Sequence, residues 1–153
     1  MNFREDADYR KRLASGFLNE AKHNFDHKLW RSCVDNSQLS VENSCKMVIA
    51  LLEPVEKSHN PSRQLRRLLE SKRLGEEFFL QAEEIIKISD RYGTEEHFMT
   101  DYGDEATLSD PWSLFDEEDA KEALAMAEKC FSLASEIMEA LLNQLQQTHD
   151  KEE

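Results

Sequence analysis

Residues 116–146 read DEEDAKEALAMAEKCFSLASEIMEALLNQLQ, and this stretch decides the fold class. It begins with Asp116, a typical helix N-cap residue, and three acidic residues follow where they complement the positive end of a helix dipole. Apolar side chains then recur every three or four residues, at Ala120, Ala123, Leu124, Ala127, Phe131, Ala134, Met138, Leu141 and Leu145. The stretch therefore predicts one long amphipathic helix.

The same periodicity occurs along the N-terminal part of the chain. It predicts helices over about residues 6–25, 29–52, 62–71 and 78–90. Pro54 ends the second of these helices, and Pro61 stands near the first helical position of the third. We expect an all-α protein, an antiparallel up-and-down helical bundle of four longer helices and one short helix.

The composition agrees with few turns and long helices, because 153 residues contain only 4 glycines and 3 prolines. We expect one bundle domain over residues 1–147, with a long acidic loop at 90–115 and a frayed acidic tail at 148–153.

The longest apolar run, residues 47–52, is too short to span a bilayer. The three cysteines are far apart and indicate reduced thiols. We therefore expect a cytoplasmic protein without a membrane span.

The net charge of −13 is concentrated in one region. Residues 90–122 hold 12 acidic and 2 basic side chains, whereas residues 1–89 hold 14 acidic and 15 basic ones. Within the balanced part, residues 57–73 carry six Lys or Arg against one acid. This run could receive phosphates or an acidic partner, or it could be a solvated helix face. The candidate phosphate- or nucleotide-binding residues are Lys57, Arg63, Arg66 and Arg67.

One pair of residues suggests a catalytic site: Arg91 and His97, which lie six residues apart in the sequence RYGTEEH. A guanidinium can hold a phosphate with two hydrogen bonds, and an imidazole can take a proton from a ribose 2′-OH or give one to a leaving oxygen. Such a pair could cleave RNA without a metal ion. In the alternative interpretation, Arg91 pairs with Asp90, Glu95 or a helix end, and His97 is an ordinary loop residue.

Metal and cofactor sites have weaker support. His23 and His27 have the four-residue spacing of a zinc-binding pair, but no third ligand follows at a suitable distance along the chain. The acidic loop does not match the spacing of a calcium-binding loop. We expect no metal ion and no cofactor.

Several stretches of the chain resemble the HEPN domain family (higher eukaryotes and prokaryotes nucleotide-binding), in particular its small prokaryotic stand-alone members. The resemblance extends from about Leu13 to Ala140. The stretches that carry it are FLNEAKHN (17–24), SQLSVENSCKMVIALL (37–52) with Glu42, Ser44 and Lys46, SHNPSRQLRRLL (58–69), RYG (91–93) and PWSLFDEEDAKEALAMAEKCF (111–131).

The resemblance implies a helical bundle that forms a homodimer and is often encoded beside a minimal nucleotidyltransferase, as half of a toxin–antitoxin pair. It also implies a metal-independent ribonuclease motif, an Arg followed after four to six residues by a His, which Arg91 and His97 satisfy. Arg91 would hold the scissile phosphate, His97 would act as general base or acid, and the partner copy would complete the cleft. Tyr92 departs from the small polar residue that commonly follows the Arg in active members.

Two functions of different class follow from these observations. The first is an endoribonuclease that uses Arg91 and His97, with the basic run at 57–73 guiding the RNA. The second is a non-catalytic helical adaptor that dimerises and binds a nucleotidyltransferase partner or a nucleotide.

Overall fold

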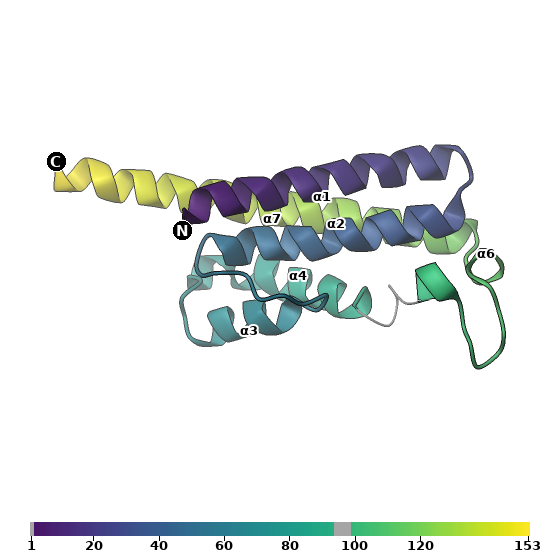
Figure 1. The fold of residues 1–153 in the computed structure, drawn as a ribbon. Helices are drawn as coiled ribbons and strands as arrows, with labels where there is room; N and C mark the ends of the chain where they lie inside the picture. The colour runs from purple at the N-terminus through teal and green to yellow at the C-terminus, as the bar shows by residue number, and fades with distance from the viewer. Residues whose placement is uncertain (1, 94–98) are drawn as a thin grey trace.

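The computed structural model describes residues 2–93 and 99–153 of the chain, and Figure 1 shows it as a bundle of long helices. The longer helices are α1 (Phe3–Asp26), α2 (Trp30–Ala50), α4 (Phe79–Arg91) and α7 (Glu117–Glu152). Helices α1 and α4 run in one direction, and α2 and α7 run in the other (Figure 1). No β-strand occurs in the described ranges, so the all-α up-and-down bundle is confirmed.

Helices α1 and α2 form a closely packed antiparallel pair. The side chain of Asn2 caps α1 by accepting hydrogen bonds from the backbone N–H groups of Arg4 and Glu5, so the helix begins a few residues earlier than its apolar pattern predicts. Small buried side chains at Ala7, Ala14 and Ala21 let α2 approach α1. The Ser40 hydroxyl of α2 donates a 2.9 Å hydrogen bond to the Ala14 carbonyl oxygen of α1.

Helix α7 packs against α1, α2 and α4 along its N-terminal two thirds. Asp116 and Asp119 form the predicted N-terminal cap, each accepting a hydrogen bond from the other's backbone N–H. The tail at 148–153, which the sequence predicts to fray, is drawn as helix up to Glu152 and projects beyond the bundle (Figure 1). No glycine or proline follows Asp116, so nothing in the local sequence ends the helix where its apolar stripe ends.

A shorter layer lies beside α2 and α7. It consists of α3 (Ser62–Glu70), the 3₁₀ turn η1 (Glu76–Phe78) and α4. Leu65 and Leu68 of α3 are buried and anchor this helix to the core. The side chain of Gln64, also buried, holds the preceding loop through hydrogen bonds to Glu53, Pro54 and Glu56.

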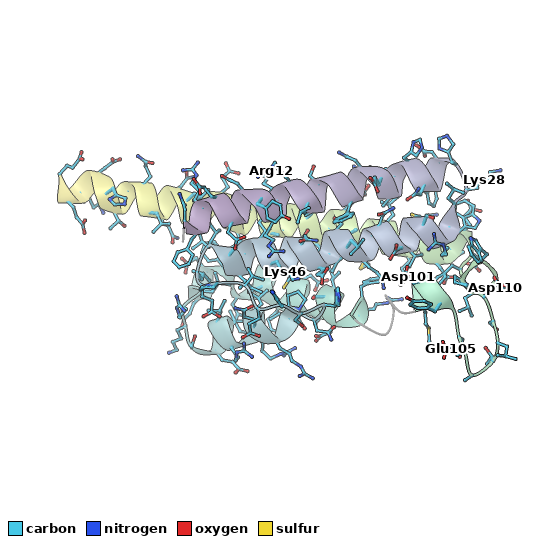
Figure 2. The ribbon with its side chains drawn as sticks, viewed as in Figure 1. Arg12, Lys28, Lys46, Asp101, Glu105 and Asp110 are labelled. Atoms are coloured by element: carbon cyan, nitrogen blue, oxygen red, sulfur yellow. The ribbon has the colours of Figure 1, made fainter. Side chains whose placement is uncertain are left out.

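The segment before α7 is more regular than the long irregular loop expected at 90–115. Residues 99–102 are helical, Asp104 and Ser109 form an isolated antiparallel bridge, and Pro111–Leu114 forms the short helix α6. Figure 2 shows the acidic side chains of Asp101, Glu105 and Asp110 along this segment, at the end of the bundle near Lys28. None of the helices in the described ranges is both long and apolar enough to cross a membrane.

Candidate functional site

The face of α2 that turns toward α3 and α4 carries polar side chains where a bundle helix usually carries apolar ones. Gln38, Glu42 and Lys46 lie one helical turn apart along this face. All three are buried, and Figure 2 shows Lys46 in the middle of the bundle. The buried polar residues of α2 are Ser37, Gln38, Ser40, Glu42, Asn43, Ser44 and Lys46.

Glu42 is the centre of a charged network. Its Oε1 lies 3.3 Å from Lys46 Nζ and 2.8 Å from His59 Nδ1. The side chains of Glu42 and Lys46 are only 10% and 11% exposed, whereas that of His59, on the loop before α3, is 58% exposed. Because a carboxylate only accepts hydrogen bonds, this contact assigns the proton of a neutral His59 ring to Nδ1 and leaves Nε2 as an acceptor.

The RYG sequence ends α4 beside this loop. Arg91 is the last helical residue, and its Nη1 lies 2.6 Å from Glu122 Oε1 of α7. Its guanidinium carbon lies 5.6 Å from the centroid of the Tyr92 ring, which is buried. A Cβ atom on Gly93 would collide with the side-chain oxygen of Asn60, so glycine leaves room for the Asn60 side chain at the end of α4.

A small cavity lies where these elements meet. It is lined by Gln38, Leu39, Glu42, His59, Tyr92 and Gly93. Its volume of about 10 Å³ is the space that a single water molecule needs. Gln38 is 2% exposed, its Oε1 accepts a hydrogen bond from Thr100, and its Nε2 has no hydrogen-bond partner among the described residues.

Of the four candidate basic residues, Arg66 is the one that contacts the end of α4 among the described residues. Arg66 Nη2 lies 3.1 Å from Asp90 Oδ2, and the same carboxylate accepts a hydrogen bond from Ser62. Arg67 pairs with Glu56, while Lys57 and Arg63 are exposed on the surface. The structure thus pairs Arg66 with Asp90, the residue that precedes Arg91. The second residue of the predicted catalytic pair, His97, lies outside the described residues.

Comparison with known proteins now gives the family. The HEPN domain family matches residues 7–142, which include α1 from Ala7, all of α2 and α4, α7 up to Leu142 and every described element of the site. This protein belongs to the HEPN domain family. The HEPN domain is a nucleotide- and RNA-related module, and this chain is one such module at the family level. No curated protein and no solved structure matches the chain.

Among the described residues of this HEPN domain, the other histidines and the cysteines do not form a similar site. His23 and His27 stack at the end of α1 with ring centroids 4.2 Å apart, and His27 Nδ1 lies 2.9 Å from the His23 carbonyl oxygen. Burial raises the pKa of Cys33 to about 11 and that of Cys130 to about 12. Burial likewise raises the pKa of Cys45 well above its ordinary value, so none of the three thiols has the character of a nucleophile.

The sequence pointed to the RYG end of α4 but gave no role to Glu42 or His59. These two residues are far apart in the chain, and only the path of the loop before α3 brings them together. The signal that could have found them is local: Glu42 and Lys46 place two opposite charges on the core face of α2. The alternative interpretation paired Arg91 with Asp90, Glu95 or a helix end. The structure places an ion pair between Arg91 and Glu122 of α7, and Glu95 lies outside the described residues.

Proposed function

We propose that this HEPN protein acts as a homodimer that binds RNA or a nucleotide at the end of α4 and cleaves RNA as a metal-independent endoribonuclease. The observation that carries the proposal is the environment of Arg91. Its side chain is 57% exposed and already holds an anionic oxygen, that of Glu122. Carboxylates and phosphates present similar oxygen pairs to a guanidinium, so an RNA phosphate can replace Glu122.

In the proposed reaction, Arg91 holds the scissile phosphate and neutralises charge on its oxygens. The ribose 2′-oxygen loses its proton and attacks the phosphorus, and the bond from phosphorus to the 5′-oxygen breaks as that oxygen gains a proton. His97 carries one of these two protons and solvent water carries the other. The products carry a 2′,3′-cyclic phosphate and a 5′-hydroxyl. Lys57, Arg63, Arg66 and Arg67 would guide the RNA backbone, and the partner copy would complete the cleft.

A second candidate function is a non-catalytic adaptor that binds a minimal nucleotidyltransferase or a nucleotide in a toxin–antitoxin-like system. One observation favours it: Arg66, Arg67 and Arg73 already form ion pairs with Asp90, Glu56 and Glu53. These pairs reduce the positive charge that the basic run offers to RNA. They also present alternating charges, which suit a protein partner.

We also place the protein in the cytoplasm. The support is the state of Cys33, Cys45 and Cys130, which are all buried free thiols. A reducing compartment preserves such thiols.

The two functions are separated by an RNA cleavage assay with a chelator present. We expect cleavage by the wild type and losses of about 100-fold or more in Arg91→Ala and His97→Ala. Arg12→Ala and His149→Ala are matched controls, because both residues are exposed on other helices, and they should cleave like the wild type. No wild-type cleavage, or equal cleavage by all variants, would reject the ribonuclease and favour the adaptor. Light scattering of the same preparations tests the homodimer.

A further inference from the structure

A second pocket lies at the end of the bundle where the turn between α1 and α2 meets α6. Its apolar lining consists of Leu29, Trp30, Trp112 and Phe115, and its volume is about 190 Å³. It shares no lining residue with the small cavity at the end of α4. An apolar cavity of about 150 Å³ holds a benzene molecule, so this pocket has room for a flat aromatic ring system.

The aromatic walls of the pocket are held in place from both sides. Trp30 packs edge-on against Phe25, with ring centroids 5.4 Å apart. Trp112 is 74% exposed, and the guanidinium carbon of Arg31 lies 5.7 Å from its ring centroid. Arg31 is fixed in turn, because it donates a 3.0 Å hydrogen bond to the Thr100 carbonyl oxygen. Such an exposed indole face is a surface on which a nucleobase stacks.

The charges that line the pocket are positive, although this end of the bundle is acidic. Lys28 and Arg31 line it, and no carboxylate does so among the described residues. Of the acids nearby, Asp101 lies 3.9 Å from Arg31, while Asp110 and Asp116 cap α6 and α7. The pocket therefore matches an aromatic group that carries a negative charge.

The backbone of Lys28 gives an independent reason to look for a role of its side chain. Its φ of 59° lies in the left-handed region that favours glycine. Its N–H bonds to the Phe25 carbonyl oxygen and that of Leu29 to the Asn24 carbonyl oxygen, which is the helix-ending pattern in which glycine is the usual residue. A lysine here strains the turn, but it places an ammonium group at the pocket (Figure 2).

We propose that this pocket binds a nucleoside monophosphate, with its base stacked on Trp112 and its phosphate on Lys28. The site is separate from the one at the end of α4, and it stands whether or not the protein cleaves RNA. A single nucleotide fits better than a long RNA. Residues 99–122 hold nine acidic side chains and one basic side chain, which repel a polyanion, whereas one phosphate reaches Lys28 at the turn.

The test uses the intrinsic fluorescence of the full chain. Trp30 and Trp112 are the two tryptophans of the sequence, and both line this pocket, so the emission reports on its occupancy. Adenosine 5′-monophosphate should quench it saturably, and adenosine, which lacks the phosphate, should bind more weakly. In calorimetry, Trp112→Ala should bind the nucleotide about 10-fold or more weakly, and Arg12→Ala, altered at an exposed cation of α1, should bind like the wild type.

Lys28→Gly separates the proposed role from a structural one, because its two effects have opposite signs. Relief of the left-handed strain should raise Tm by about 2–4 °C, while loss of the ammonium should weaken binding about 5-fold or more. Lys28→Arg should retain binding. Equal affinity in Lys28→Gly and the wild type would overturn the placement of the phosphate.

Three results would overturn the site itself. They are no saturable quenching by the nucleotide, unchanged affinity in Trp112→Ala, and loss of binding in Arg91→Ala but not in Trp112→Ala, which would place the nucleotide at the end of α4. Tighter binding of a six-nucleotide RNA than of the monophosphate would overturn the choice of ligand. RNA cleavage is not measured here, so failure of the ribonuclease proposal is a separate result.

Discussion

The pair formed by Glu42 and Lys46 gives the most quantitative prediction. In Glu42→Gln the ammonium of Lys46, with a side chain only 11% exposed, loses its counter-charge. Removing one partner of a buried ion pair costs about 3–5 kcal/mol. The glutamine amide still offers an oxygen to Lys46 and His59, so we expect the lower end, about 3 kcal/mol.

The assay is urea and thermal unfolding followed by far-UV circular dichroism. For a chain of this length, about 3 kcal/mol lowers Tm by about 6–12 °C. In the double variant with Lys46→Met both charges are absent, and we expect a free energy of unfolding within about 1 kcal/mol of the wild type. A loss below about 1 kcal/mol in Glu42→Gln, or additive losses in the double variant, would show that the two charges do not form a buried pair.

Three further predictions concern separate regions. Glu122→Gln removes the anion that competes for Arg91, so RNA should bind about two- to five-fold more tightly in fluorescence anisotropy, and weaker binding would contradict the exchange of carboxylate for phosphate. Burial raises the pKa of the Cys33 thiol from 9.0 to about 11 in the folded protein, so the unfolded chain loses this proton at lower pH. The free energy of unfolding should therefore fall as pH rises from about 9 to about 11, and it should fall less steeply in Cys33→Ala. Asp116→Ala should cost about 1 kcal/mol, and Asp116→Ser, which restores a capping oxygen, should cost less; equal losses would argue against the cap.

The helices could be predicted because their signals are local. The apolar spacing lies within each helix, and Pro54 and Asp116 lie next to the helix ends that they help to set. The predicted bounds of α2 and α3 agree with the structure within a few residues. The end of α7 could not be predicted in this way. Its last residues lack an apolar stripe, but they also lack a glycine or proline, and backbone hydrogen bonding continues the helix to Glu152.

The site was predictable only in part, for the same physical reason. The Arg91 motif is local, so its place at the end of α4 could be read from the sequence. The contacts of Glu42 with His59 and of Arg91 with Glu122 join different elements. They depend on how the loop before α3 and the start of α7 pack, which residue spacing does not encode.

Transesterification at the end of α4 leaves characteristic ends on the RNA products, and these ends can be identified by mass. Mass spectrometry of a short RNA incubated with the wild type and chelator should find 2′,3′-cyclic phosphate and 5′-hydroxyl ends. Arg91→Ala, purified in the same way, should give neither product. Intact RNA with the wild type, products with 3′-hydroxyl ends, or the same products from Arg91→Ala would contradict transesterification at Arg91.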